Sequence, residues 1–351
     1  MPKMKAAVFA EPGRIVLEEK EIPAPGPGEA LLRVTTTTIC GTDVHILKAE
    51  YPVKRGLTVG HEPVGTIAAL GKGVTGFKEG QRVIAGAITP CGQCSSCFQG
   101  HHSQCGDKPL GGWQLGNTID GSQAEYVVIP NAVANLAPVP DSLSDEQVLM
   151  CPDIMTTGFS GAESGGVQIG DSVAIFAQGP IGLCATAGAK LLGATRIIGV
   201  DTVPARLEIS KQLGADETID FNRKNPVEEI MRMTNGRGVD VAIEALGLPE
   251  TFENCLSIIK PGGKVSSLGV YSEDLRLPID AFAAGLGDRC ISSTLCPGGQ
   301  ERMRRMMSVI ASGRVNLSPL VTHRFKLDQI EEAYELFSNQ GDGVLKVAVT
   351  P

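Results

Sequence analysis

Between residues 172 and 294, short apolar runs alternate with helical segments, and this alternation constrains the fold more than any other feature of the sequence. The apolar runs predict strands at Ser172–Ala177, Arg196–Val200, Glu217–Asp220, Val239–Ala245, Lys264–Leu268 and Cys290–Thr294. The segments between them predict helices at Pro180–Gly193, Pro204–Gly214, Pro226–Thr234 and Pro249–Ile259. Strands linked by crossover helices form parallel sheets, so we expect an α/β unit with a doubly wound sheet here.

The residues before about position 150 follow a different pattern, in which Gly and Pro divide short apolar runs. Strands are expected at Lys5–Phe9, Glu29–Thr36, Val64–Leu70 and Arg82–Ala85. Many short strands separated by turns favour an antiparallel barrel or sandwich. Beyond Pro297, the sequence predicts helices at Gln300–Ser312 and Leu327–Asn339 and a last strand at Gly343–Val349.

The turn after the first strand of the α/β unit carries a reduced form of a dinucleotide-binding fingerprint. It reads Ala177-Gln178-Gly179-Pro180-Ile181-Gly182, with Ala in the place of the first glycine. Gly179 would let a pyrophosphate approach the backbone, and Gly182 would let the helix lie close to the strand. The N-terminus of the helix that starts with Pro180 and Ile181 would offer N–H donors and positive potential to the phosphates.

Asp201 ends the next predicted strand, about twenty residues further on, where the ribose-binding acid of such a fingerprint is expected. Its carboxylate would accept hydrogen bonds from the adenosine ribose and repel a 2′-phosphate, which favours NAD over NADP. Arg206 is a candidate contact for the adenosine half of the cofactor. The alternative is an ordinary strand–turn–helix with a solvated Asp201 and a solvated Arg206.

Four cysteines fall within fifteen residues, in the pattern Cys91-x2-Cys94-x2-Cys97-x7-Cys105. Four thiolates at this spacing can converge on one tetrahedral zinc ion, which they saturate, so the site would be structural. Disulfides and unligated thiols are the alternatives. An iron–sulfur cluster fits less well, because the ferredoxin pattern has a shorter last gap and a Pro after its fourth Cys.

Composition excludes several classes of protein. The net charge of −8 argues against a general surface for nucleic acids or anionic membranes. The first twenty residues lack the apolar core of a signal peptide, and no apolar run is long enough to span a bilayer. We therefore expect a cytoplasmic protein, whose reducing surroundings favour metal binding over disulfides at the four cysteines.

Three further segments carry residue types that bind metals, although a single Cys or His is more often a packed side chain than a metal ligand. Cys40 lies in Thr38–His45, His61 and Glu62 lie in Gly60–Gly65, and Asp153 lies in Cys151–Gly158. Spacing alone cannot show that they meet. Together with the four-cysteine lobe, the turn at residues 179–182 and Leu345-Lys346, these segments resemble the medium-chain, zinc-dependent alcohol dehydrogenases over essentially the whole chain.

The resemblance implies a fold and a division into domains. A GroES-like β-barrel catalytic domain would comprise residues 1–153 and 297–351, and a Rossmann domain that binds NAD would comprise residues 154–296. Pro152–Gly158 resembles the branch of bacterial secondary-alcohol dehydrogenases, whereas the liver-type enzymes carry Cys at the position of Asp153. Several enzymes of that branch lack the four-cysteine lobe and prefer NADP, so their cofactor preference is not carried over.

The resemblance also implies roles for single residues. Cys40, His61 and Asp153 would bind a catalytic zinc, which would make two zinc ions per chain. Thr42 would take the proton of the substrate alcohol and pass it through the nicotinamide ribose to His45. Glu62 matches a family residue that can approach the zinc. Trp113, the only tryptophan, matches a residue that lines the substrate pocket.

We therefore expect an enzyme that transfers a hydride between NAD(H) and a small, largely apolar alcohol or ketone, with secondary alcohols favoured. An NAD-dependent polyol or L-threonine dehydrogenase is the main alternative. A non-catalytic relative with a binding or structural role is a further one. The resemblance implies a homo-oligomer, with a tetramer favoured over a dimer, and the physiological substrate, direction and stereopreference stay open.

Overall fold

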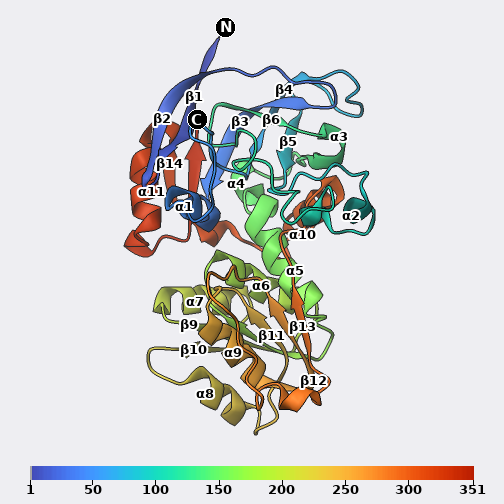
Figure 1. The fold of residues 1–351 in the computed structure, drawn as a ribbon, viewed down its shortest axis with the longest axis vertical. Helices are drawn as coiled ribbons and strands as arrows, with labels where there is room; N and C mark the ends of the chain where they lie inside the picture. Colours follow the sequence, from blue (N-terminus) through green and yellow to red (C-terminus); the bar gives the residue numbers. More distant parts are fainter. Residues whose placement is uncertain (1) are drawn as a thin grey trace. The chain divides into compact units, whose positions relative to one another are not determined.

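The computed structural model describes residues 2–351, and their contacts divide the chain into two compact units. Unit 1 combines the chain up to Thr156 with Cys296–Pro351, and unit 2 comprises Thr157–Leu295 (Figure 1). Within residues 2–351, no helix is both long and apolar enough to cross a membrane.

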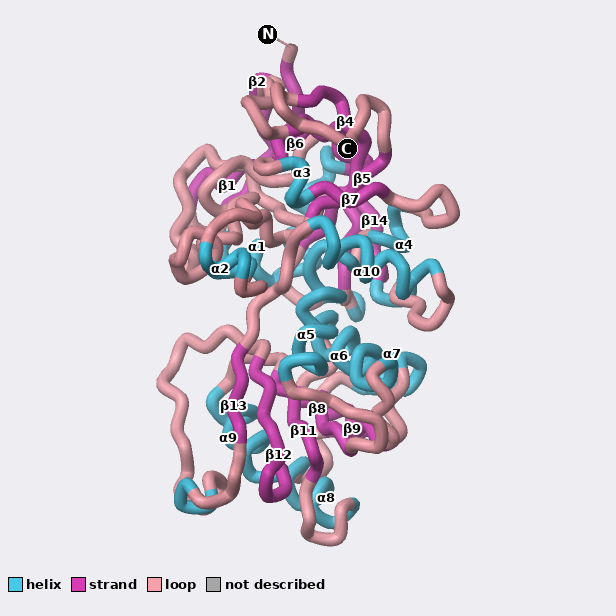
Figure 2. The backbone as a smooth tube through the Cα atoms, turned by 90° about the vertical axis from the view of Figure 1, so that its right-hand side faces the viewer, coloured by secondary structure: helices cyan, strands magenta, loops and turns pink. Residues whose placement is uncertain are grey.

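Unit 2 is built on a six-stranded parallel sheet with the order β10-β9-β8-β11-β12-β13, and Figure 2 shows β13 at one edge. Its strands are β8 (Ser172–Phe176), β9 (Arg196–Asp201), β10 (Glu217–Asp220), β11 (Val239–Glu244), β12 (Ile259–Ser267) and β13 (Cys290–Ser293). Its helices are α5 (Thr156–Ser164), which begins at the last residue of unit 1, α6 (Pro180–Leu191), α7 (Pro204–Leu213), α8 (Pro226–Met233) and α9 (Pro249–Ile258). The strand order reverses between β8 and β11, and this confirms the doubly wound sheet expected from the sequence.

Both faces of this sheet are buried, and alternate residues of one strand contribute to different cores. Val173 and Ile175 of β8 pack with Ala185 of α6, whereas Ala174 and Phe176 pack with Phe252 of α9. Successive side chains of a strand point to opposite faces, so the nearly continuous apolar run of β8 follows from helices on both sides.

Unit 1 contains a seven-stranded sheet in which β14-β15-β3-β4-β5-β7 are neighbours and β6 also pairs with β3, beside a separate β1–β2 hairpin. Its strands are β1 (Lys3–Glu11), β2 (Arg14–Glu21), β3 (Ala30–Ile39), β4 (Val64–Leu70), β5 (Arg82–Ala85), β6 (Tyr126–Ile129), β7 (Leu136–Pro138), β14 (Val321–Lys326) and β15 (Lys346–Thr350). Its short helices are α1 (Gly41–Leu47), α2 (Ser95–Phe98), α3 (Ala132–Asn135) and α4 (Asp145–Val148), and the π-helical turn η2 spans Cys151–Met155.

The C-terminal segment completes unit 1. Strand β15 pairs antiparallel with β3, and helix α11 (Ile330–Ser338) lies against β2, so the red end of the chain meets its blue beginning in Figure 1. Helix α10 (Gln300–Ala311) packs against β7 and η2. The antiparallel pairing expected for the first 150 residues is confirmed by β3 with β4 and β6, and by β5 with β4 and β7. Beyond Pro297, for which no pairing was predicted, β14 and β15 are parallel. They can be parallel because α11 lies between them in the sequence and carries the chain back.

Candidate metal centres and nucleotide turn

Donor atoms of four residues meet inside unit 1. One ligand atom from each of Cys40, His61, Glu62 and Asp153 lies within 4.8 Å of the others, and all four residues are buried. Cys40 follows β3 and begins α1, His61 and Glu62 lie just before β4, and Asp153 lies on the π-helical turn η2. Such turns widen a helix by one residue and occur often at functional sites.

The distances among these donors fit zinc. Cys40 Sγ lies 3.3 Å and His61 Nε2 lies 3.4 Å from Asp153 Oδ2. A tetrahedral zinc ion with its usual bond lengths separates sulfur, nitrogen and oxygen ligands by about 3.3–3.5 Å. One thiolate, one imidazole and one carboxylate leave a fourth position open, as a catalytic zinc site requires.

Asp43 lies beside Nδ1 of the His61 imidazole, where it can orient the ring. Its Oδ1 lies 3.4 Å from His61 Nδ1, on the opposite side of the ring from Asp153. Burial opposes the charged form of His61, but the carboxylates of Asp43 and Asp153 outweigh burial and raise its pKa well above the usual value. The same two carboxylates would attract a metal cation, and Asp43 would be the partner that fixes the ring.

Glu62 is held by a buried lysine. Lys346 Nζ donates to Glu62 Oε1 over 2.6 Å, and both side chains are almost fully buried. Burial raises the pKa of Glu62 to about 7 although Lys346 opposes the rise. Glu62 Oε2 is buried and has no hydrogen-bond partner, so this carboxylate oxygen remains available as a ligand atom.

Sequence reasoning missed the roles of Asp43 and Lys346. Asp43 stands three residues after Cys40 at the start of a helix, and its Oδ2 accepts the Cys40 backbone N–H over 2.9 Å. An acid at this position often caps a helix, so its local role hid the second one. Lys346 lies in the apolar segment Val344–Val349, where a buried lysine requires an acidic partner.

Aromatic rings lie next to the ligands. The ring of Trp113 is 6.4 Å from that of His61 and 5.5 Å from that of Tyr51, which in turn is 5.4 Å from the ring of His45. Trp113 is buried, and its Nε1 donates to Leu115 O over 3.1 Å, which fixes the plane of the indole. Tyr51 was not predicted, because no motif in the sequence includes it.

The two expected relay residues lie on α1. Thr42 Oγ1 is 3.8 Å from Cys40 Sγ and its side chain is partly exposed. His45, one turn later, is about half exposed and its Nδ1 is paired with a carboxylate oxygen of Glu50. The hydrogen bond to His45 is the main reason that the pKa of Glu50 is lowered.

The four cysteines of the lobe also converge, with one ligand atom each within 4.8 Å of the others. Cys97 Sγ lies 3.4 Å from Cys94 Sγ and 3.9 Å from Cys91 Sγ, whereas four thiolates around one zinc are separated by about 3.8 Å. None of these four cysteines forms a disulfide in the structure.

Backbone N–H groups point at these sulfurs. Gly106 N donates to Cys94 Sγ over 3.1 Å and Cys91 N donates to Cys105 Sγ over 3.2 Å. The hydrogen bond from Gly106 is the first reason that the pKa of Cys94 is lowered to about 6, while burial raises the pKa of Cys105 to about 12. Thiolates bind metals, so the lowered pKa of Cys94 favours it as a ligand, and a bound cation would stabilise the deprotonated form of the buried Cys105.

In unit 2, the turn from β8 to α6 is tight and leaves space beside the start of the helix. Ala177, which replaces the first glycine, adopts a left-handed conformation with φ +69°. A Cβ on Gly182 would lie 1.9 Å from Ala177 O, so no larger residue fits there. A Cβ on Gly179 would meet nothing within 4 Å, which leaves open space beside the first turn of α6, where free N–H groups bind phosphates.

Asp201 ends β9 and is tied to this turn. Its Oδ2 accepts the N–H of Gln178 over 2.6 Å, and its Oδ1 accepts the N–H of Val203 over 2.8 Å. Arg206 Nη1 lies 3.9 Å from the same carboxylate and is partly exposed. The alternative of a solvated Asp201 does not hold, because the residue is buried.

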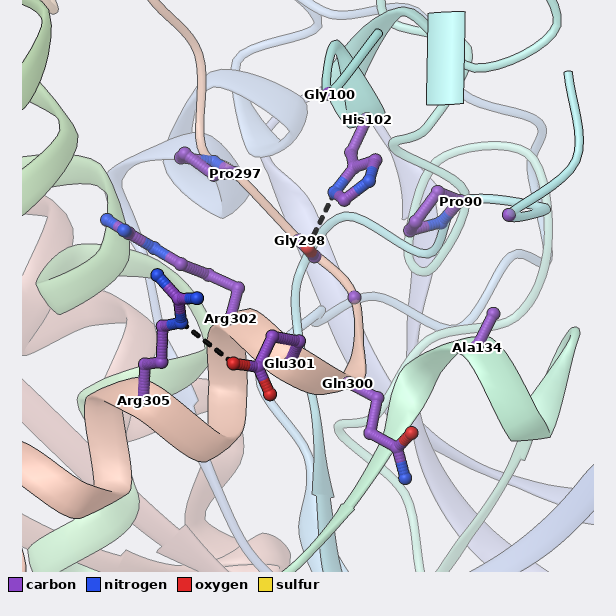
Figure 3. Close-up of a pocket in the computed structure, with 12 residues that line it drawn as sticks. Pro90, Gly100, His102, Ala134, Pro297, Gly298, Gln300, Glu301, Arg302 and Arg305 are labelled. Atoms are coloured by element: carbon purple, nitrogen blue, oxygen red, sulfur yellow. Dashed lines mark hydrogen bonds and ion pairs between the residues drawn. The ribbon is translucent and has the colours of Figure 1, made fainter. Parts of the chain in front are cut away.

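A separate cavity of about 440 Å³ lies in unit 1 between the cysteine lobe and the start of α10 (Figure 3). His102 Nδ1 lies 2.7 Å from Gly298 O, and Glu301 pairs with Arg305 at 2.8 Å, as the dashed lines in Figure 3 show. Arg302, which also lines the cavity, donates from Nε to Thr156 Oγ1 over 2.7 Å. None of the four donors around Cys40 lines this cavity, so it is distinct from the candidate catalytic site.

Comparisons with known proteins agree with this geometry. Residues 26–141 match the alcohol dehydrogenase GroES-like domain, and residues 180–312 match the zinc-binding dehydrogenase family. An alcohol dehydrogenase of Cupriavidus necator is 61 % identical over 361 aligned positions, which cover 99 % of each chain. An NADP-dependent isopropanol dehydrogenase of Thermoanaerobacter brockii is 37 % identical over 99 % of each chain.

A solved structure shows the same fold. Zinc-dependent alcohol dehydrogenase 2 from Streptococcus pneumonia, in its apo form, superposes with a TM-score of 0.91 and is 36 % identical, covering 99 % of this chain and 98 % of that one. The resemblance drawn from the sequence is thereby confirmed, together with the GroES-like and Rossmann folds. The chain belongs to the zinc-dependent medium-chain alcohol dehydrogenase family.

Proposed function

We propose that the protein transfers a hydride between NAD(H) and a small alcohol or ketone, with secondary alcohols favoured, and that it holds two zinc ions per chain. The observation that carries the proposal is the meeting of Cys40, His61 and Asp153 at zinc-ligand distances. A zinc ion held there would act as a Lewis acid on the substrate oxygen. We also propose that residues 1–153 and 297–351 form the catalytic domain and that residues 154–296 form the NAD-binding domain.

The protein's own groups orient the substrate and handle its proton. Thr42, beside Cys40, can both accept and donate a proton, and we assign it the alcohol proton. His45 would receive this proton by way of the nicotinamide ribose, and Glu50 would stabilise the resulting imidazolium. Trp113 and Tyr51 would give the substrate an apolar wall, which supports a small alcohol rather than a sugar acid.

The four-cysteine lobe would hold the second, structural zinc, because four thiolates leave no position for a substrate. Metal analysis of the purified protein tests both sites, with two zinc ions per chain as the expected result. Asp153→Asn should lose turnover and one zinc ion while NAD affinity is unchanged, and Cys94→Ser should lose the other zinc ion. A wild-type protein without zinc would refute both assignments.

We propose NAD rather than NADP as the cofactor, although a relative at 37 % identity is named for NADP. Support comes from Asp201, whose buried carboxylate lies where the ribose hydroxyls are expected and would repel a 2′-phosphate. Gly179, Pro180, Ile181 and Gly182 would hold the pyrophosphate, and Arg206 would contact the adenosine. Asp201→Gly should weaken NAD and improve relative use of NADP, whereas unchanged kinetics with both would remove Asp201 from the site.

The substrate class is open to a direct test. Absorbance at 340 nm would be followed with 2-butanol, sorbitol and L-threonine, each with NAD and with NADP. We expect the highest kcat/KM with 2-butanol and NAD. Preference for sorbitol or L-threonine would establish the polyol or threonine alternative, and absence of turnover with zinc-loaded protein on all three would favour the non-catalytic alternative.

We further propose a homotetramer, in preference to a dimer, that works in the cytoplasm, where its ligand thiols stay reduced. Support for self-association comes from β13, which pairs only with β12 among the described strands, and from exposed apolar residues around it, including Leu286 at 86 % exposure and Ile291. Light scattering coupled to gel filtration would measure the assembly, and a monomer at micromolar concentration would contradict it.

A further inference from the structure

A chain of buried polar side chains runs from helix α11 to the imidazole of His61. Tyr334 Oη donates to Gln123 Oε1 over 2.7 Å, and Gln123 Nε2 donates to Asp43 Oδ2 over 3.0 Å. The three side chains are at most 3 % exposed. Buried polar groups are costly unless each is satisfied, so such a chain holds its members in one arrangement.

The direction of every hydrogen bond in this chain is determined. Gln123 Nε2 faces two acceptors, the Asp43 carboxylate and Thr38 O at 3.1 Å. A reversed amide would place its oxygen against both of these acceptors. Gln123 Oε1 must therefore face Tyr334, and the tyrosine hydroxyl must be the donor.

This arrangement sets the position of the Asp43 carboxylate. Its Oδ2 receives two hydrogen bonds, from the Cys40 backbone and from Gln123. Its Oδ1 has no hydrogen-bond partner and lies 3.4 Å from His61 Nδ1. The hydrogen bonds to Oδ2 thus hold the Asp43 carboxylate in place, and Oδ1 faces the imidazole of His61. The other nitrogen of this ring, Nε2, faces Cys40 and Asp153.

We propose that Gln123 and Tyr334 are positioning residues for metal binding: through Asp43 they fix the orientation of His61 and so raise the affinity of the Cys40–His61–Asp153 site for zinc. The inference rests on the proposed function, since it assumes that zinc binds there. Partners of metal-ligating histidines change metal affinity by about 10–100-fold when they are removed. Gln123 acts one step further away, so we expect a change near the lower end.

A purely structural role would give a different result. Gln123 also packs closely on the loop before His61, because a Cβ on Gly60 would lie 2.5 Å from Gln123 Cγ. Removing the amide could therefore lower stability without touching the metal. Val127, in strand β6 four residues later, packs in a core that contains none of the site residues and offers a matched control.

The experiment compares Gln123→Leu, Tyr334→Phe and Val127→Ala with the wild type, as full-length protein. Zinc affinity is measured by competition with a chelator, and Co²⁺-substituted protein is examined by visible absorption. For Gln123→Leu we expect the dissociation constant of the mixed-ligand site to rise about tenfold and its Co²⁺ bands to shift. Tyr334→Phe should have a smaller effect of the same sign, because the Gln123 amide keeps its two acceptors.

Val127→Ala should lower the melting temperature without changing zinc affinity or the Co²⁺ bands. The bands of the four-thiolate site should be the same in all proteins. If Gln123→Leu does not fold, Gln123→Glu keeps the shape and sets a carboxyl group against Asp43, and a weakened site is again expected.

Two outcomes separate the inference from the proposed function. If the wild type shows both metal sites and Gln123→Leu binds zinc as tightly with unshifted bands, the inference is overturned. If the wild type shows only the four-thiolate spectrum, the proposed function fails and the inference fails with it.

Discussion

Replacement of Lys346 by Met tests the reasoning about the buried pair with Glu62. The two side chains are 1 % and 0 % exposed and 2.6 Å apart. Removal of one member of such a pair leaves a buried charge without its partner and costs about 3–5 kcal/mol. A domain of this size loses roughly 2–4 °C of melting temperature per kcal/mol, so a decrease of about 6–20 °C is expected in Lys346→Met.

The measurement is thermal unfolding in the presence of a chelator, so that zinc does not contribute. Lys5→Met is the matched control, because Lys5 pairs with Asp328 at 2.7 Å on the surface, where ion pairs are worth about 0–1 kcal/mol. The double variant Glu62→Gln with Lys346→Met should recover part of the loss, because no buried charge remains.

The loss should also depend on pH. Burial raises the folded-state pKa of Glu62 to about 7, above its unfolded value, so the folded state binds more protons and stability falls as pH rises between these values. Without Lys346 that pKa rises further. The defect of Lys346→Met should therefore be smaller at about pH 5 than at about pH 8, and a defect no larger than that of Lys5→Met at either pH would refute the reasoning.

Three other changes test local features of unit 2. Ala177→Gly should raise stability by about 0.5–1 kcal/mol in thermal unfolding, because it removes left-handed strain at φ +69°, and a lower melting temperature would contradict the strain. Gly182→Ala should weaken NADH at least about tenfold in a fluorescence titration, because its Cβ would lie 1.9 Å from a carbonyl oxygen, and wild-type affinity would show that the turn adapts freely. Asn225→Ala should cost about 1 kcal/mol, because Asn225 Oδ1 caps α8 by accepting from two backbone N–H groups, whereas Asn225→Asp keeps the acceptor and should not.

Local sequence patterns correctly predicted several strands whose ends are determined by neighbouring residues. Strands β4, β5 and β10 begin and end where the apolar runs do, because Gly, Pro or charged residues stop them. The pairing of β14 with β15 escaped prediction, since it depends on how α11 returns the chain. The π-helical turn at residues 151–155 was also missed, because its extra residue leaves no mark on the helical period.

For the candidate site, the sequence indicated the ligands but not what surrounds them. Cys40, His61 and Asp153 were named through a family resemblance, and the structure places their donor atoms together. Asp43, Gln123 and Tyr334 were not predicted, because the sequence around each of them shows no pattern that marks a functional residue. Their connection exists only after residues more than two hundred positions apart have been brought into contact.

The division of unit 1 between two stretches of sequence has a consequence for synthesis on the ribosome. Cys40, His61 and Asp153 are all translated before unit 2, but Lys346, the counter-charge of Glu62, stands five residues before the end of the chain. A nascent polypeptide that has exposed every candidate ligand of the catalytic zinc still lacks strand β15 and carries an unneutralised acid beside them. Completion of this centre must therefore await the synthesis of strand β15, after the whole of unit 2, whereas the cysteine lobe, which is contiguous in sequence, can acquire its metal earlier in translation.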